Sequence, residues 1–236
     1  MSTRSKGGHL RLIEETSGAE SVTQRVYMTL RRDIISGKLT PGMKLKVEQL
    51  RRDYGVGTSP LREALSLLTS DYLVERNDQR GFRVSQISQK EYDELLKTRC
   101  WLEERAMRES IKNGDEEWKE QIILANYRLS RIPRAQADAH CNTSADWEVA
   151  HKIFHKALIS RCGSSILLKY CDQLYDQNVR YRRLSVSKAY PDRNITEEHN
   201  QLCDAVVEGD SDLAVQLLLS HYEVTSGYVR HELGAS

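Results

Sequence analysis

The 236-residue chain has no apolar run approaching the roughly 18 residues of a membrane span, and its N-terminus lacks the apolar stretch of a secretory signal. Its five cysteines are odd in number and scattered, without a CxxC pair, so we expect reduced, mostly buried thiols rather than a disulfide framework. The 39% hydrophobic and 29% charged content is ordinary for a globular protein. These absences predict a cytoplasmic globular protein.

The net charge of +1 conceals an asymmetry along the chain. Residues 1–86 hold 15 Lys and Arg against 10 Asp and Glu, whereas residues 87–236 hold 20 against 24. A basic front part favours a polyanionic partner such as nucleic acid, although a solvated charged surface explains the same numbers.

The front part of the chain has the order of a winged helix-turn-helix. Residues 1–20 are polar and predict a flexible tail. Apolar residues then recur every four positions at Val22, Val26, Leu30 and Ile34, which predicts a helix ending before Gly37. The pattern continues with helices over 47–54 and 60–72, the latter capped by Thr58 or Ser59, and with strands over 73–76 and 81–84. We expect a DNA-binding domain over 21–87.

From Gln89 onward the sequence shows no strand pattern. Six helical segments fit the apolar spacing, over 89–112, 115–131, 144–161, 164–184, 195–208 and 211–231. The breaks between them fall at Gly114, Pro133, Gly163, Pro191 and Gly209. The expected fold is therefore mainly α, with the winged helix joined to an all-helical bundle of six helices over 88–231.

Several residues of the front module are placed to contact DNA. The second helix of a helix-turn-helix enters the major groove with its N-terminal residues at the base edges. In this sequence the residues at that position are Thr58, Ser59 and Arg62. An arginine there can bind a guanine with two hydrogen bonds. The candidates for phosphate contacts are Arg31, Arg32, Lys44 and Lys46, with Arg80 and Gly81 at the tip of the wing.

The motifs of the front module resemble the GntR family of bacterial regulators. They are Tyr27-x-x-Leu30-Arg31-x-x-Ile34-x-x-Gly37-x-Leu39-x-Pro41-Gly42, then Ser59-Pro60-Leu61-Arg62-Glu63-Ala64-Leu65, and the wing segment Arg80-Gly81-Phe82-Arg83-Val84. The back part is similar to the helical FCD effector domain of the FadR subfamily, beginning at Arg99-x-x-Leu102-Glu103. The resemblance implies a homodimer that binds a palindromic operator as a repressor.

The chain departs from that family at two DNA-contacting positions. Thr58 stands where an arginine is usual just before the Ser-Pro-x-Arg-Glu segment, and Glu48 stands where the preceding helix usually carries an arginine. Arg62 and Arg80 remain. The operator sequence therefore cannot be carried over from the family.

Four of the seven histidines are spaced to meet at one point. His151 and His155 are four residues apart on one predicted helix and so share a face. His199 and His221 each lie 11 residues from Asp210, on opposite arms of a predicted helical hairpin, and so face one another about 16 Å from its turn. Each histidine alone is ordinarily a hydrogen-bonded core or surface residue, but the four together predict a divalent metal site.

Similarity to FCD domains strengthens this metal prediction, because many of them hold a divalent ion with one Asp and three His. In this chain the usual Asp position is His151, while Asp146 lies out of phase with that face. Replacing a carboxylate by an imidazole favours zinc or nickel over magnesium or calcium. The site then keeps its 2+ charge, which attracts an anion.

The segments around His151–Ser164 and Arg180-Tyr181-Arg182 look most like the CsiR type, the repressors of glutarate and hydroxyglutarate breakdown. This likeness implies a small dicarboxylate or hydroxy acid as effector. Arg99 and Arg180 are the candidates for binding its carboxylate, with surface salt bridges as the alternative role.

Two other functions compete with a ligand-responsive regulator. A metal-dependent hydrolase could use an open coordination position to activate water, but the chain has no HExxH motif and no evident carboxylate base beyond Glu148. A scaffold protein with structural histidines is the other alternative.

Overall fold

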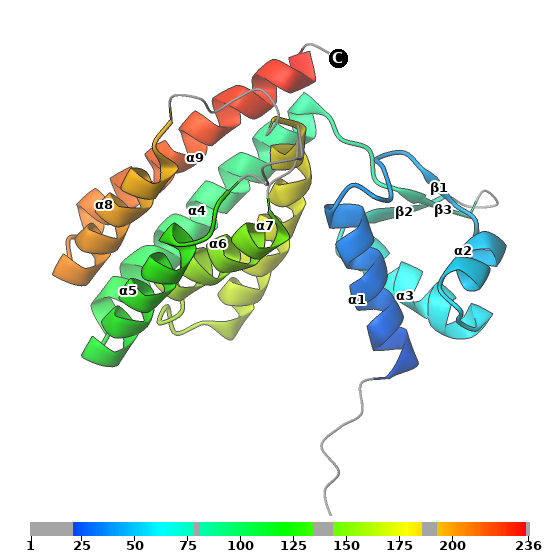
Figure 1. Cartoon of the computed structure of the whole chain (residues 1–236), viewed down its shortest axis with the longest axis horizontal. Coiled ribbons are helices and arrows are strands. Elements are labelled where there is room, and N and C mark those ends of the chain that lie inside the picture. Colours follow the sequence, from blue (N-terminus) through cyan, green and yellow to red (C-terminus); the bar gives the residue numbers. More distant parts are fainter. Residues whose placement is uncertain (1–20, 78–80, 135–143, 186–192, 235–236) are drawn as a thin grey trace, which may run out of the picture.

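The computed structural model describes residues 21–77, 81–134, 144–185 and 193–234. Figure 1 shows a small module of helices and a sheet beside a larger bundle of long helices, joined by the segment that leads from the sheet into α4. This arrangement confirms the expected fold class. The expected tail 1–20, Arg80, Cys141 and the Pro191 break lie outside the described residues.

The N-terminal module has its elements in the predicted order. They are α1 (Val22–Ile35), β1 (Lys44–Leu45), α2 (Val47–Asp53), α3 (Thr58–Ser70), β2 (Val74–Asn77) and β3 (Gly81–Val84). The antiparallel sheet has the order β1-β3-β2, with Leu45 opposite Phe82 and Val74 opposite Val84. Strand β1 was not predicted, because two residues are too few to show an alternating pattern.

The start of α3 differs from the prediction. The helix begins at Thr58, and its N-cap is Gly57, which offers no side-chain cap hydrogen bond. Pro60 still falls in the first turn, where its missing N–H costs nothing. The helix packs Leu61 and Leu65 into a core that also holds residues of α1 and the sheet. The earlier start brings Thr58 and Ser59 into the helix rather than before it.

Among its described residues, the C-terminal module has six helices at the predicted places. They are α4 (Gln89–Asn113), α5 (Glu116–Ser130), α6 (Ala145–Leu158), α7 (Ser165–Ser185), α8 (Ile195–Glu208) and α9 (Ser211–Gly234). Side-chain caps fix several starts, since Ser88, Asp115 and Ser144 accept a hydrogen bond from a backbone N–H of the first turn. Gly209 closes α8 with φ of 83°, the left-handed conformation that favours glycine.

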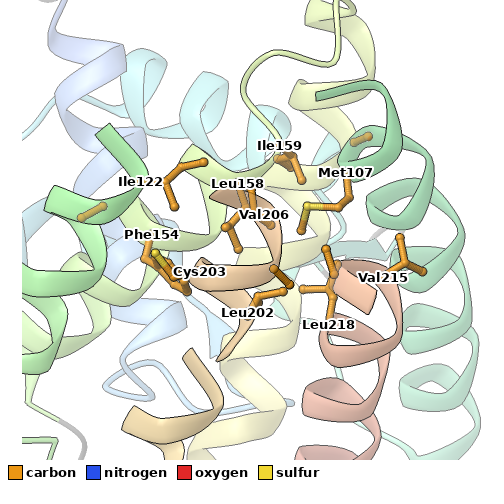
Figure 2. Close-up of a cluster of buried hydrophobic side chains, with 14 of the residues drawn as sticks. Met107, Ile122, Phe154, Leu158, Ile159, Leu202, Cys203, Val206, Val215 and Leu218 are labelled. Atoms are coloured by element: carbon orange, nitrogen blue, oxygen red, sulfur yellow. The ribbon is translucent and has the colours of Figure 1, made fainter. Parts of the chain in front are cut away.

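Helix α6 is held in the bundle by the apolar residues that alternate with its histidines. Phe154 and Leu158 are fully buried in a core shared with residues of α4, α5, α8 and α9, part of which Figure 2 shows. Because Phe154 and Leu158 lie next to His155 or one turn from it, burying them also carries the imidazoles inward.

No helix among the described residues is long and apolar enough to cross a membrane.

Helix α7 connects the two modules. Gln173 Nε2 donates to the Asp71 carboxylate at 2.9 Å, and Gln177 Nε2 donates to the Asp71 carbonyl at 3.2 Å. One turn further on, Arg180 Nη2 donates to the carbonyl of Ser85 at 2.6 Å. These three side chains of α7 lie along one face, at spacings of four and three residues. They hold the turn after α3 and the segment after β3 against the bundle.

Candidate functional site

The four predicted histidines meet inside the helical module. His151 and His155 come from α6, His199 from α8 and His221 from α9, and all four are buried. One nitrogen from each lies within 4.8 Å of the others. The i, i+4 pair and the α8–α9 hairpin thus bring their imidazoles together as the sequence predicted.

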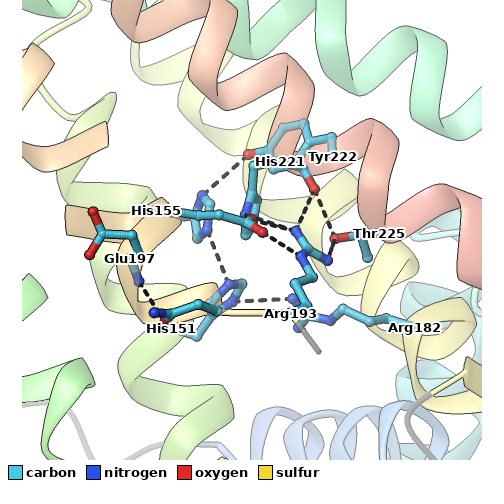
Figure 3. A network of polar contacts seen from close by, with 10 residues as sticks. His151, His155, Arg182, Arg193, Glu197, His221, Tyr222 and Thr225 are labelled. Carbon is cyan, nitrogen blue, oxygen red and sulfur yellow. Dashed lines mark hydrogen bonds and ion pairs between the residues drawn. The ribbon is translucent and has the colours of Figure 1, made fainter. Parts of the chain in front are cut away.

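Two of the imidazoles are oriented by a polar group behind them. His221 Nδ1 lies 2.7 Å from Glu198 Oε2. His155 Nδ1 lies 3.3 Å from the Tyr222 hydroxyl (Figure 3). Arg193 Nη2 lies 3.3 Å from His221 Nδ1, but the Glu198 carboxylate is closer and only accepts, so His221 donates from Nδ1. The Tyr222 hydroxyl gives its proton to Glu103 Oε2 and so accepts from His155 Nδ1. Both rings therefore turn an unprotonated Nε2 toward the cluster.

His151 is held in the opposite way. Its Nδ1 lies 3.2 Å from Arg182 Nη1 and 2.6 Å from the Tyr175 hydroxyl. A guanidinium can only donate, so Nδ1 accepts and the ring proton sits on Nε2. That Nε2 lies 3.1 Å from His155 Nε2, to which it donates. The cluster therefore contains two imidazoles, His155 and His221, with inward lone pairs, and His151, at the family's usual Asp position, is hydrogen-bonded to His155.

The cluster fits a divalent cation. His199 Nε2 is buried and has no hydrogen-bond partner among the described residues, which is costly unless a ligand supplies one. Burial, followed by neighbouring imidazoles, lowers the pKa of His151, His155 and His199 well below the usual value. Burial also lowers the pKa of His221 to about 4, although its hydrogen bond to Glu198 acts in the opposite direction. The imidazoles are thus neutral near pH 7, the form that binds a metal.

Three buried or half-buried arginines surround the histidines, and each is paired with a carboxylate. Arg99 Nε donates to Glu103 Oε1 at 2.6 Å, Arg182 Nη2 to Glu148 Oε2 at 2.5 Å, and Arg193 Nη2 to Glu198 Oε2 at 2.5 Å. The pairs offset the positive charges around the cluster, which favours a bound cation there.

A small cavity opens beside the cluster on the side of α4, α7 and α9. It is lined by Tyr92, Leu96, Arg99, His151, Asn178, Arg182, His221, Tyr222 and Thr225. Two guanidiniums and two imidazoles therefore face the same space. The cavity volume is about 10 Å³, so a small anion can enter only when these side chains move apart, and it would then have charged donors on one side and the histidine cluster on the other.

The two arginines predicted for effector binding lie in different places. Arg99 lines this cavity, where its Nη2 also donates to the Tyr222 hydroxyl at 2.8 Å. Arg180 instead faces the N-terminal module, and Arg182 occupies the cavity wall. Two residues advance a helix by about 200°, so neighbouring arginines of one motif point to opposite sides. The spacing of Tyr175, Asn178 and Arg182 could have identified the inward face, because positions i, i+3 and i+7 coincide on a helix.

The residues predicted to contact DNA lie mostly on the surface of the N-terminal module. Arg32, Lys44, Lys46, Ser59, Arg62 and Gly81 are exposed, and Thr58 is half-buried. Gly81 begins β3 with φ of 84°, a conformation that few other residues adopt. These surface positions leave the proposed DNA contacts sterically available.

Arg31 differs from the other predicted DNA contacts. Its guanidinium forms an ion pair with Asp176 of α7, and its side chain is only 19% exposed. Lys152, next to His151, holds the other side of the same carboxylate, with Nζ 2.8 Å from Asp176 Oδ1. In this structure Arg31 therefore connects the modules rather than facing solvent.

Arg62 gives the sharpest test of the DNA-binding surface. We expect Arg62→Ala to weaken binding of the selected operator by about 5- to 150-fold and to relax selectivity at one base pair, because a base-contacting arginine contributes about 1–3 kcal/mol. Lys46→Ala should weaken all sequences alike and lower the salt slope by about 1. Fluorescence anisotropy at several salt concentrations measures both. Arg128→Ala, an exposed arginine of α5, is the matched control. Unchanged affinity in Arg62→Ala would exclude Arg62 from the contact.

Comparisons with known proteins agree with both modules. Residues 22–84 match the family described as bacterial regulatory proteins, gntR family, and residues 94–224 match the FCD domain. An uncharacterized HTH-type transcriptional regulator, BphR of Paraburkholderia xenovorans, is 36% identical over 91% of this chain and 87% of its own length. The HTH-type transcriptional repressor GlaR of Escherichia coli is 31% identical over 83% of this chain and 90% of its own length.

Solved structures share the fold. McbR/YncC of E. coli has a TM-score of 0.70 at 20% identity, covering 89% of this chain and 98% of that one. A GntR regulator from Rhodococcus also has a TM-score of 0.70, at 22% identity, with 91% and 98% covered. Both modules, in order and over nearly the whole length, are those of transcription regulators and not of enzymes. The chain belongs to the GntR family of DNA-binding transcription regulators with a C-terminal FCD domain, in which it buries a cluster of four histidines.

Proposed function

We propose that this protein is a repressor released from its operator when a small carboxylate binds beside a divalent metal in the FCD domain. It acts as a homodimer on a palindromic site, in the cytoplasm where the chromosomal DNA lies. Three observations support the metal: the converging neutral imidazoles, the partnerless Nε2 of His199 and the polar groups that orient His155 and His221.

Zinc or nickel suits the site better than magnesium or calcium. All four candidate ligands are imidazoles, which bind borderline ions, whereas Mg²⁺ and Ca²⁺ prefer oxygen ligands. When bound, such an ion would supply a Lewis-acidic position for a carboxylate oxygen. Arg182 and Arg99, on the wall of the adjoining cavity, would then fix the orientation of the acid through charge-assisted hydrogen bonds.

The observation that carries the regulatory proposal is the position of α7 between the cavity and the DNA-binding module. Asn178 and Arg182 line the cavity, while Gln177 and Arg180 bind the turn after α3 and the segment after β3. An acid that displaces the inward face of α7 therefore acts on a rigid element that also positions α3. To release DNA it must bind the DNA-incompetent arrangement more tightly, because equal affinity shifts no equilibrium.

The test is selection of an operator from random DNA, followed by titration with glutarate in the presence of Zn²⁺. We expect one palindromic site to be enriched, and the acid to weaken its binding by about 5- to 150-fold, the range of allosteric coupling energies near 1–3 kcal/mol. Chelation of the metal should abolish the response. Protein that enriches no specific site, or whose response is the same with and without chelator, contradicts the proposal.

Arg180→Ala separates effector binding from transmission. Because Arg180 contacts Ser85 and not the cavity, we expect the variant to keep the wild-type Kd for the acid while losing most of the acid-induced change in operator affinity. Calorimetry gives the first quantity and anisotropy the second. Arg108→Ala, which removes one ion pair within α4 and one between α4 and the start of α9, should change neither. A raised Kd for the acid would instead show that Arg180 binds the effector itself.

A further inference from the structure

One side chain on the cavity wall has an unmet hydrogen-bonding need. Asn178 is 5% exposed, and its Oδ1 has no hydrogen-bond partner among the described residues. Leaving a buried amide oxygen without a donor costs about 1–3 kcal/mol, and most buried polar atoms in native proteins are satisfied. The residue lies on the inward face of α7, one turn before Arg182.

The surroundings of Asn178 indicate what kind of group would meet that need. The cavity it lines is also lined by Arg99 and Arg182, whose guanidiniums can donate to the carboxylate of a ligand. Those arginines can only donate, so a carboxylate satisfies them but offers nothing to an amide oxygen. A ligand that satisfies both must carry a hydrogen-bond donor close to its carboxylate.

We propose that Asn178 is a specificity-determining residue that selects hydroxy acids over acids without a hydroxyl group. The inference rests on the proposed function, because it concerns the acid bound beside the histidines. A hydroxyl group near the carboxylate donates to Asn178 Oδ1, while the carboxylate meets the arginines. An acid without the hydroxyl leaves the amide oxygen buried and unpaired, and sites built to bind a hydroxyl discriminate strongly against such analogues.

The test uses three acids that differ at one carbon atom: glutarate, 2-hydroxyglutarate and 2-oxoglutarate. Lactate with propionate, and malate with succinate, give the same comparison at other chain lengths. Kd is measured by calorimetry on the full-length Zn²⁺-loaded protein without DNA. We expect the wild type to bind the hydroxy acid about tenfold or more tightly than its partner without the hydroxyl. The oxo acid, which can only accept, should bind no better than the unsubstituted acid.

The variants decide whether Asn178 causes the preference. Asn178→Leu, close in size but apolar, should bring the ratio of the two Kd values near one, mainly by weakening the hydroxy acid. Asn178→Ala repeats the test if leucine disturbs folding. Asn126→Ala removes an amide that pairs with Asn200 outside the cavity and should keep the wild-type ratio.

Three results would overturn the inference: equal binding of hydroxy and unsubstituted acids by the wild type, preference for the oxo acid, or an unchanged ratio in both Asn178 variants. Failure of the proposed function looks different. In that case none of the acids binds, or the acids bind but leave operator affinity unchanged.

Discussion

Replacing His155 by alanine is expected to lower the affinity for Zn²⁺ by more than a hundredfold. Loss of an outer partner of a metal ligand typically costs 10- to 100-fold, and loss of a ligand itself should exceed that range. His155 is fully buried and its Nε2 faces the other imidazoles, so no side chain or solvent replaces it. Competition with a chromogenic chelator measures the affinity, and elemental analysis gives the metal content per chain.

The same variant should also lose metal-dependent stability. A ligand at a hundred times its Kd stabilises a folded protein by about 2.7 kcal/mol, so chelation should lower the Tm of the wild type and barely change that of His155→Ala. His231→Ala is the matched control, since this histidine is on α9 like His221 but its side chain is 80% exposed. Equal metal content in His155→Ala and the control would contradict the proposed centre.

The hydrogen-bond pattern predicts unequal effects within the cluster. The variants His155→Ala, His199→Ala and His221→Ala should lose most of the metal affinity. His151→Ala should lose less, because the Arg182 guanidinium holds His151 with its proton facing the cluster. His151→Asp restores the residue usual in the family and should shift preference toward Mn²⁺, since a carboxylate is the harder ligand.

Replacing Arg99 by alanine is expected to destabilise the FCD domain by about 3–5 kcal/mol, the range measured when one partner of a buried ion pair is removed. Arg99 is 2% exposed and Glu103 is 3% exposed, and they form an i, i+4 pair inside α4. Without the guanidinium, the Glu103 carboxylate would be buried with only the Tyr222 hydroxyl as its hydrogen-bond donor among the described contacts. Urea unfolding followed by circular dichroism measures the loss.

Helix α4 provides its own control for this prediction. Arg105 and Glu109 form a second i, i+4 pair, but Arg105 is 72% exposed, so Arg105→Ala should change stability by less than about 1 kcal/mol. The double variant Arg99→Met with Glu103→Leu should recover most of the lost stability, because it leaves no uncompensated charge. A small effect of Arg99→Ala, equal to that of Arg105→Ala, would show that Glu103 does not depend on Arg99.

Most of the fold could be predicted from local patterns. The helices α4 to α9 begin and end within a few residues of the predicted bounds, because capping residues and glycines mark the ends. Strand β1 and the start of α3 could not be predicted in this way. A two-residue strand exists only through its pairing with β3, and Gly57 offers no side chain that signals a cap.

The sequence by itself determined two histidine pairs, because a spacing of four on one helix and equal distances from a turn are properties of helix geometry. Packing of α6 against the α8–α9 hairpin brought the pairs together. Only the tertiary structure decided how the four differ, since Arg182, Tyr222 and Glu198 reach them from other helices. The tertiary structure also decided that Arg180 of α7 contacts the segment after β3, while Arg182 of the same helix lines the cavity. Helix periodicity fixes which residues share a face, whereas the neighbour that each face meets depends on how the whole bundle packs.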